Sequence, residues 1–283
     1  MRVSSQDRPP RRDARRRWLG LLAALAAGLG ASSRADAGSL PVERQESYAA
    51  SRLAVAGLVG SLRVERHDGA KIRLVLRGSA RAVEGLRREL DGDRLQLTAA
   101  PGVSGRATVV TGSANVVIAR AGATATQIIG GMPSGATGPA EPPLEVLAYV
   151  PAATPLTVTG MVGELVVERV GGRVDLELIG GEARLDRAAG GSLAAVAGSR
   201  IELAQATGEL KIAIQGAGEV RISRADLDRL EVGVSGTGEV AVGGIAQQAS
   251  VSIAGVGGVR IDEVRARPEV SVTGLGQVEI GNW

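Results

Sequence analysis

The sequence predicts an all-β protein, a right-handed parallel β-helix (β-solenoid) with rungs of about 18–21 residues. Three observations predict it. A glycine and valine motif recurs at a nearly fixed period of roughly 20 residues, apolar and polar residues alternate within each copy, and the copies are rich in β-branched residues. Glycine every few residues disfavours a helix, because each glycine costs roughly 1 kcal/mol in a helix interior.

The repeat is clearest in residues 210–283, where four copies read LKIAIQGAGEVRI, LEVGVSGTGEVAV, VSIAGVGGVRI and VSVTGLGQVEI. The first turn glycine of each copy falls at nearly the same interval from the last, at Gly216, Gly236, Gly255 and Gly274. Every second residue on either side of the turn is apolar, which is the period of a strand with one buried face. The same letters allow an antiparallel hairpin array, but like residues at like positions favour parallel stacking of each copy on the next.

The glycines are interpreted as corner residues, because a tight corner often needs a positive φ that glycine adopts without a Cβ clash. Upstream, Gly160, Gly180 and Gly198 continue the ladder to Gly216 at similar intervals. A phosphate-binding loop would need GxGxxG or GxxxxGK[ST] at the start of a helix. No helix is predicted after these turns.

Residues 1–37 form a predicted signal peptide that is removed before Gly38. An arginine cluster is followed by the apolar run 18–31 and by small residues at the two positions that a signal peptidase reads. The apolar run is about 14 residues, shorter than the roughly 20 that a spanning helix needs. The letters RRRWL resemble a twin-arginine signal, so both twin-arginine export and general secretion stay open, as do the periplasm and the cell surface.

Charge and composition limit the function classes. The first 37 residues carry eight arginines and three aspartates, so the formal net charge of +3 for the whole sequence becomes −2 for the mature chain. With no aromatic platform beside the remaining arginines, nucleic acid is not an expected partner. The sequence has no cysteine, which excludes disulfides, thiolate metal sites and thiol catalysis.

The mature chain divides into four predicted parts: a lead-in at 38–52, a first solenoid part at 53–102, a Gly/Ala/Pro-rich insertion at 103–143 and the main solenoid part at 144–283. The lead-in is expected to be an extended arm or a first capping strand. LAVAGLVGSLRVE at 53–65 matches LTVTGMVGELVVE at 156–168, which indicates two related halves. A short helix is expected in AVEGLRREL, and strands are expected in IRLVLRG, RLQLTAA, ANVVIA and TQIIGG.

These residues resemble the putative auto-transporter adhesin, head GIN domain, and the neighbouring putative-adhesin β-solenoid family. The resemblance rests on LAVAGLVGSLRVERHDG, on LEVLAYVPAATPLTVTGMVGELVVERVGG and on the repeated IQGAGEV, VSGTGEV, IAGVGGV and VTGLGQV. It covers residues 53–283. It implies an exported bacterial β-helix protein of adhesin-like type.

Candidate catalytic residues are few, and each has a structural reading. Carbohydrate-active β-helix enzymes group several Asp, Arg or Lys residues on one flank, often with calcium. The nearest matches lie in predicted turns, where such residues are ordinarily solvated: Arg224, Asp226, Asp228 and Arg229, and separately Asp91 and Asp93. His67, the sole histidine, lies in the turn RHDG. No GxSxG nucleophile elbow, with which it could form a catalytic triad, stands out in the sequence. We therefore predict no catalytic, cofactor or metal site.

The last residue, Trp283, is expected to cover the open end of the solenoid core, because an uncapped rung exposes strand edges. The expected function is non-catalytic binding or a structural role at the cell envelope. The partner is an envelope or surface component, protein or polysaccharide, and the mature chain has no transmembrane span. The alternative is a carbohydrate-active β-helix enzyme, a polysaccharide lyase or hydrolase.

Overall fold

A computed structural model describes residues 41–99, 109–110, 116–118, 126–128 and 143–283, all within one compact unit, Gly38–Trp283. The predicted all-β class is confirmed, since the described residues hold a single short helix, α1 (Ala80–Gly85). The predicted signal peptide at 1–37 and most of the insertion at 103–143 lie outside the described residues.

The strands that precede the insertion are β1 (Val42–Tyr48), β2 (Arg52–Ala56), β3 (Val59–Arg66), β4 (Ile72–Gly78), β5 (Leu86–Asp91) and β6 (Arg94–Ala99). Within the insertion lie the short strands β7 (Val109–Val110), β8 (Val116–Ile118) and β9 (Thr126–Ile128), which form an antiparallel sheet of their own. The main part contains β10 (Leu144–Val150), β11 (Leu156–Glu168), β12 (Val174–Val196), β13 (Ser199–Val264), β14 (Glu269–Gly274) and β15 (Gln277–Asn282). Strands were thus correctly expected in ANVVIA and TQIIGG.

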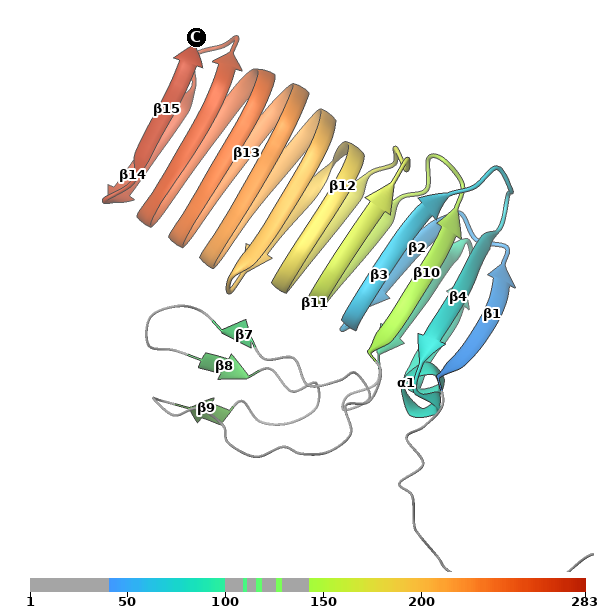
Figure 1. The fold of residues 1–283 in the computed structure, drawn as a ribbon. Coiled ribbons are helices and arrows are strands. Elements are labelled where there is room, and N and C mark those ends of the chain that lie inside the picture. Colours follow the sequence, from blue (N-terminus) through green and yellow to red (C-terminus); the bar gives the residue numbers. More distant parts are fainter. Residues whose placement is uncertain (1–40, 100–108, 111–115, 119–125, 129–142) are drawn as a thin grey trace, which may run out of the picture. The chain divides into compact units, whose positions relative to one another are not determined.

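From β11 to β15 the main sheet is a parallel ladder in which the chain coils past itself at a regular interval (Figure 1). We call each such coil a rung. Like residues meet across rungs: Val251 pairs with Val270, and Ile261 pairs with Ile280. Leu193 likewise pairs with Ile212. The predicted valine and isoleucine columns are therefore in register where these pairs lie.

The two segments that match in sequence, 53–65 and 156–168, are neighbours in this ladder. β11 pairs in parallel with both β2 and β3, with Leu156 opposite Leu53 and Leu165 opposite Leu62. The chain leaves this rung after β3 and returns, beyond the insertion, to stack on it as β11. The match therefore falls on adjacent rungs of one sheet, where stacked positions need similar residues.

The N-terminal end of the sheet departs from the expected all-parallel arrangement. β10 enters between β3 and β4, pairing in parallel with the first and antiparallel with the second, and β1 adds antiparallel to β4. β5 and β6 form an antiparallel hairpin around Gly92 and Asp93. The sheet is thus mixed. The alternation of apolar residues could not show this, because it is the same in parallel and antiparallel strands.

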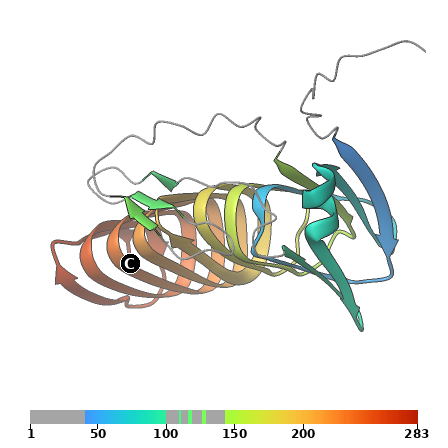
Figure 2. The same cartoon turned by 90° about the horizontal axis from the view of Figure 1, so that it is seen from below.

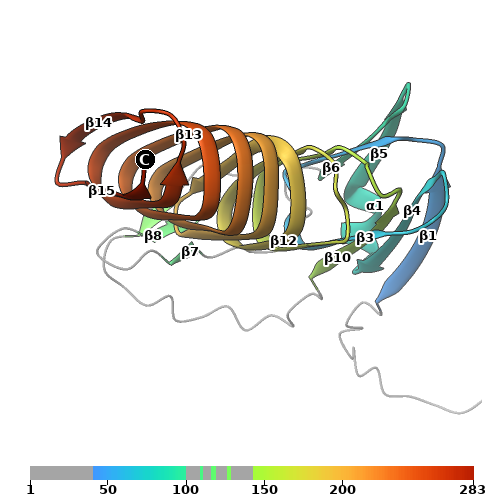
Figure 3. The same cartoon turned by 90° about the horizontal axis from the view of Figure 1, so that it is seen from above.

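The core is aliphatic and continuous, built from buried Leu, Val, Ile, Ala and Met side chains of β2 to β6 and of β10 to β13. Helix α1 contributes Ala82 and Val83, 5% and 1% exposed, and lies beside β1 and β4 at the end of the sheet (Figures 2 and 3). The expected helix in AVEGLRREL thus ends at Gly85, and the rest of that segment is β5. The helix helps to cover the N-terminal end of the core.

Glycines form a ladder at the corner between the two strands of each rung. In the earlier rungs this ladder contains other glycines than the predicted Gly160 and Gly180. Gly163 pairs with Gly60 and with Gly181, whereas Gly180 lies opposite Val162 and not opposite Gly160. A Cβ on Gly181 would overlap the carbonyl oxygen of Gly163. The close approach of neighbouring rungs, together with positive φ, explains why glycine is needed here.

The C-terminal end is not covered as expected. Trp283 is 76% exposed, and the last rung also exposes Leu275 (83%), Val270 (47%) and Val272 (42%). Only Val278 and Ile280 of β15 pack against the core while remaining partly exposed. The prediction that Trp283 caps the core is therefore wrong.

Candidate binding surface

One face of the ladder is formed by the outward residues of β3, β11, β12 and β13. The apolar members of the second strand of each rung, such as Leu165, Ala183 and Ile201, are fully buried. Because side chains alternate along a strand, the residues between them face solvent. Stacking then sets the outward residues of successive rungs about 4.8 Å apart, so any charge pattern in the sequence becomes a pattern on the surface.

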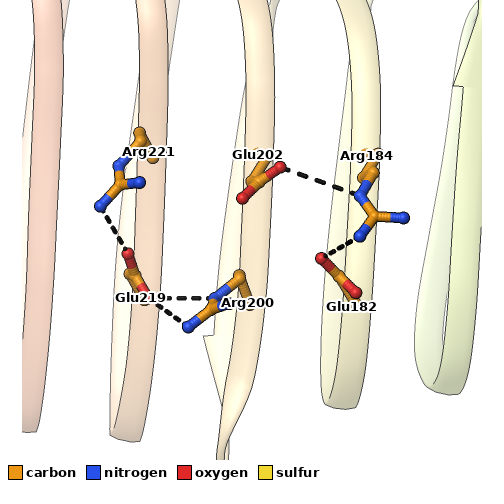
Figure 4. Close-up of polar contacts among 6 residues, drawn as sticks. All are labelled: Glu182, Arg184, Arg200, Glu202, Glu219 and Arg221. Carbon is orange, nitrogen blue, oxygen red and sulfur yellow. Dashed lines mark hydrogen bonds and ion pairs between the residues drawn. The ribbon is translucent and has the colours of Figure 1, made fainter.

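Opposite charges meet across these rungs in an ion-pair lattice, shown in Figure 4. Glu182 lies opposite Arg200, and Arg184 lies opposite Glu202. The lattice comprises Arg184 with Glu182 (2.8 Å) and with Glu202 (3.8 Å), Arg200 with Glu219 (2.9 Å), and Arg221 with Glu219 (3.0 Å). Exposed pairs of this kind stabilise a fold by no more than about 1 kcal/mol each, and here they leave this part of the face nearly neutral.

The lattice continues toward the N-terminal end through Arg63, which contacts Glu168 at 2.6 Å and Glu65 at 2.8 Å. The carboxylate of Glu168 is the main cause that raises the pKa of Arg63. Each arginine of the lattice therefore has an acidic partner in its own rung or in the next.

Three residues further along each strand, the pattern changes. Four arginines and one aspartate line a solvent-open hollow of about 390 Å³, together with Ala204 and Gln205. We call it the arginine hollow; its charged residues are Arg66, Arg169, Asp186, Arg187 and Arg224. Within the described part of the chain, Arg66 pairs with Asp68 at 3.3 Å, but no ion pair engages the other three guanidinium groups.

Register explains the alignment of these arginines. Glu65 pairs with Glu168, and Val167 pairs with Leu185, and the arginines that shortly follow these pairs line the same hollow. Arg187 pairs with Gln205, which takes the place of an arginine in the next rung. Like charges stacked on neighbouring strands repel one another, so the column is an electrostatic cost to the isolated fold.

Arg169 adopts a left-handed backbone with φ of 57°, which is uncommon for a residue with a side chain. Its backbone N–H donates a hydrogen bond to Oδ2 of Asp186 at 3.0 Å. Glycine would adopt this conformation without strain, yet the position carries an arginine. The only acidic side chain that lines the hollow, among the described residues, is thus held by the backbone of the chain itself.

Sequence reasoning missed the hollow, although a signal for it exists. The segments RVER (63–66), VVER (166–169), RLDR (184–187) and RISR (221–224) end the second strand of four rungs, each with an arginine two residues after a buried aliphatic residue. Alternation along a straight strand would turn a residue two places after a buried one inward, yet all four arginines are exposed, so the alternation breaks at this point of each rung. Only the register shows that they lie side by side.

His67 has a structural role in its turn. Its Nδ1 accepts a hydrogen bond from the backbone N–H of Gly69 at 2.8 Å, and its Nε2 lies 2.5 Å from the carbonyl oxygen of Lys71. Both ring nitrogens are therefore engaged by the turn between β3 and β4. The imidazole stabilises this turn and contacts no nucleophile among the described residues.

The aspartates considered as catalytic candidates do not converge. Asp226 and Asp228 are exposed on β13 and flank the fully buried Leu227, so they occupy alternate outward positions. The adjoining Arg224 lines the arginine hollow, and Arg229 is exposed further along the strand.

Asp93, in the hairpin turn, accepts a hydrogen bond from Oγ of Ser51 at 2.6 Å, which is the main cause that lowers its pKa. Asp91 faces solvent beside it, opposite Arg94. Both residues thus belong to the β5–β6 turn and to its contact with the start of β2. Across the described ranges, no group of three or more His, Cys, Asp or Glu residues could hold a metal ion.

Part of the chain matches a known protein family. Residues 189–282 match the family described as "Putative auto-transporter adhesin, head GIN domain". This confirms the resemblance that the repeated turns indicated, for the part of the chain from β12 to β15. No curated protein matches the chain.

Among solved structures, a putative adhesin from Bacteroides fragilis is similar in fold, with a TM-score of 0.61 and 13% identity over 85% of this chain and 96% of that chain. A putative adhesin from Parabacteroides merdae has a TM-score of 0.41 and 10% identity over 86% and 97% of the two chains. A putative lipid binding protein from Parabacteroides distasonis has a TM-score of 0.35 and 14% identity over 86% and 97%. The first of these supports the fold alone. Among the described residues, no helix is both long and apolar enough to span a bilayer.

Proposed function

We propose, from the match of residues 189–282 to the head GIN domain family, that this chain is an exported, adhesin-like bacterial protein with a non-catalytic binding role at the cell envelope. Its finer architecture is proposed to be a right-handed parallel β-helix closed at its N-terminal end by antiparallel strands and α1. The regular parallel registers from β11 to β15 support this architecture, and crossovers between parallel strands are right-handed in about 98% of cases.

The observation that carries the proposal is the contrast between surface and core. The rungs are strongly specified by aliphatic columns and corner glycines, while the outward face offers ordered charges. An enzyme would need titratable groups grouped at one point. Asp226 and Asp228 give the carbohydrate-active alternative no support, because neither lines the arginine hollow and both lie on β13, away from Asp91 and Asp93 in the β5–β6 turn.

Export is tested by expressing the full sequence in a bacterium and determining the N-terminus of the fractionated product. Removal of residues 1–37 before Gly38 is expected, with the product in the periplasm or on the surface. An uncleaved product that remains inside the cell would contradict export. Replacing the arginine run 15–17 by lysine separates the routes, because a twin-arginine signal would fail and a general secretion signal would still be cleaved.

Binding is tested with fluorescent mature chain, residues 38–283, added to washed bacterial envelopes, while soluble sugar ends are assayed in the same tube with and without calcium. Saturable retention without sugar release is expected. Absence of retention would contradict a binding role. Sugar release that disappears in Asp226→Asn would replace the proposal with the enzymatic alternative.

A further inference from the structure

We infer that the arginine hollow binds a linear anionic polysaccharide, one that carries carboxylate or sulfate groups along its chain. This inference rests on the proposed function, because an exported binding protein meets such polymers outside the cytoplasm. It gives that function a place on the molecule and a class of ligand.

The charges of the hollow favour an anionic ligand. Arg169, Arg187 and Arg224 have no carboxylate partner within the described residues, and they face a single acidic side chain, Asp186. Three residues earlier on the same strands, the arginines of the lattice are paired. The arginines of the lattice thus have glutamate partners within the protein, whereas Asp186 is the one acidic side chain that lines the hollow. A bound anion would relieve the repulsion along the column.

The length of the column favours a polymer over a small ion. From Arg66 to Arg224 the hollow crosses four steps between rungs, which is about 19 Å at about 4.8 Å per step. One phosphate or sulfate ion could contact only neighbouring arginines. An extended chain with an anionic group at intervals could contact several, and each guanidinium can hold a carboxylate or sulfate through two parallel hydrogen bonds.

The surroundings of the hollow disfavour other polyanions and lipid. Duplex DNA carries about one charge per 1.7 Å of its axis, and it would bring phosphates against the carboxylates of the neighbouring lattice. Among the described residues, no aromatic side chain lines the hollow for base stacking. Ala204 is the sole apolar side chain among them, so an acyl chain finds no contact surface there.

Arg169 supplies an independent argument. An arginine at φ of 57° stores strain, and glycine at this corner would relieve it. The strained residue projects into the hollow from one of its central rungs. Strained residues cluster at ligand sites, so the outlier and the charge pattern point to the same place.

The test measures binding of mature chain to immobilised polygalacturonate, dextran sulfate and neutral dextran by biolayer interferometry. Binding is expected to one or both acidic polymers and not to neutral dextran. The variant R187A/R224A should weaken it by at least about tenfold. Its matched control, R184A/R221A, removes the same charge from the same strands three residues earlier, and should change binding by less than about twofold.

A second variant guards against misfolding. Arg169→Gly is expected to leave the melting temperature unchanged or higher and yet to weaken binding several-fold. Ala197→Gly relieves a similar backbone, φ of 39°, at another corner without removing charge, and should bind like the parent. Equal losses in Arg169→Gly and Ala197→Gly would overturn the role of the arginine.

Three outcomes would overturn the inference: no binding to either acidic polymer, equal losses in the two double variants, or tighter binding to duplex DNA or to phosphatidylglycerol vesicles than to both polysaccharides. Retention on bacterial envelopes that persists in R187A/R224A would refute the hollow while leaving the proposed binding function intact. Loss of envelope retention together with polymer binding would support both.

Discussion

At the scale of single residues, the corner glycines set how closely the rungs approach. Gly181 has φ of +110°, and a Cβ there would overlap the backbone of Gly163. The nearest atom is a carbonyl oxygen, which cannot move aside without disturbing the ladder. Gly258, in a later rung, has open space around its Cβ position.

We therefore expect Gly181→Ala to lower the free energy of unfolding by at least about 2 kcal/mol, because backbone strain adds to the clash. Gly258→Ala should change it by less than about 0.5 kcal/mol. Urea denaturation of both variants measures the difference. Equal stability of the two variants would show that the rungs do not approach as described.

The phenol of Tyr48 provides a second residue-level prediction. Burial, followed by the hydrogen bond that its hydroxyl donates to Glu46, raises its pKa to about 12 from an ordinary value of 10.0. A raised pKa means that the folded state favours the neutral phenol. The stabilising effect is thus complete below pH 10 and is lost as the pH rises toward 12.

Alkaline titration should accordingly show the unfolding free energy of the parent falling between pH 10 and 12, and Tyr48→Phe should lack that component of the fall. Absorbance of tyrosinate follows the ionisation directly, since the sequence holds only one other tyrosine, Tyr149. A Tyr48 that ionises at its ordinary pH would contradict the burial of its ring against the core.

At the scale of elements, the two ends of the ladder differ. Helix α1 begins at the N-cap Ser79, whose Oγ accepts a hydrogen bond from the backbone N–H of Ala82 at 3.2 Å. The helix is only six residues long, so its own hydrogen bonds do little to maintain it. Its position depends on this cap and on the burial of Val83.

Ser79→Ala is expected to destabilise the protein by about 1 kcal/mol and to increase hydrogen exchange in α1 and β5 before any other element. Ser252→Ala, an exposed strand substitution, is the control and should leave exchange unchanged. Uniform exchange over the whole chain in Ser79→Ala would argue against α1 as a separate covering element.

Sequence reasoning was reliable for features that repeat and unreliable for features that occur once. The columns through Val251 and Ile261 follow from alternation and period. The antiparallel β4 could not be distinguished, because a short run of apolar residues such as that in IRLVLRG occurs in parallel and antiparallel strands alike. The arginine hollow was overlooked because the alignment of Arg169 and Arg187 depends on register, which only the neighbouring rung defines.

Trp283 shows a different limit. Its size and position suggested a cover for the core, yet β15 stays paired with β13 as far as Asn282 and the Trp283 side chain that follows is exposed. The apolar side chains of the last rung, Val270, Val272 and Leu275, are therefore left exposed together with Trp283. The sequence pattern predicted that an end of the core is covered, but it predicted the wrong end. The structure covers the N-terminal end, with α1.

At the scale of the whole molecule, function and architecture depend on the same feature, which is rungs stacked in parallel and in register. The ion-pair lattice and the arginine hollow each combine residues from successive rungs, so a slip of one residue would break both. The absence of cysteine from the sequence makes this register directly measurable, because introduced cysteines have no competitors.

Ala254 lies opposite Thr273 on neighbouring strands of the last rungs, and both are exposed. With cysteine at both positions, mild oxidation should close a disulfide in nearly all molecules, since paired residues fall within the Cα separation that a disulfide spans. Cysteines at Ala254 and Ser271, offset by two residues, should stay reduced. Closure of the offset pair in preference to the paired one would contradict the parallel register on which the lattice, the arginine hollow and the proposed binding all depend.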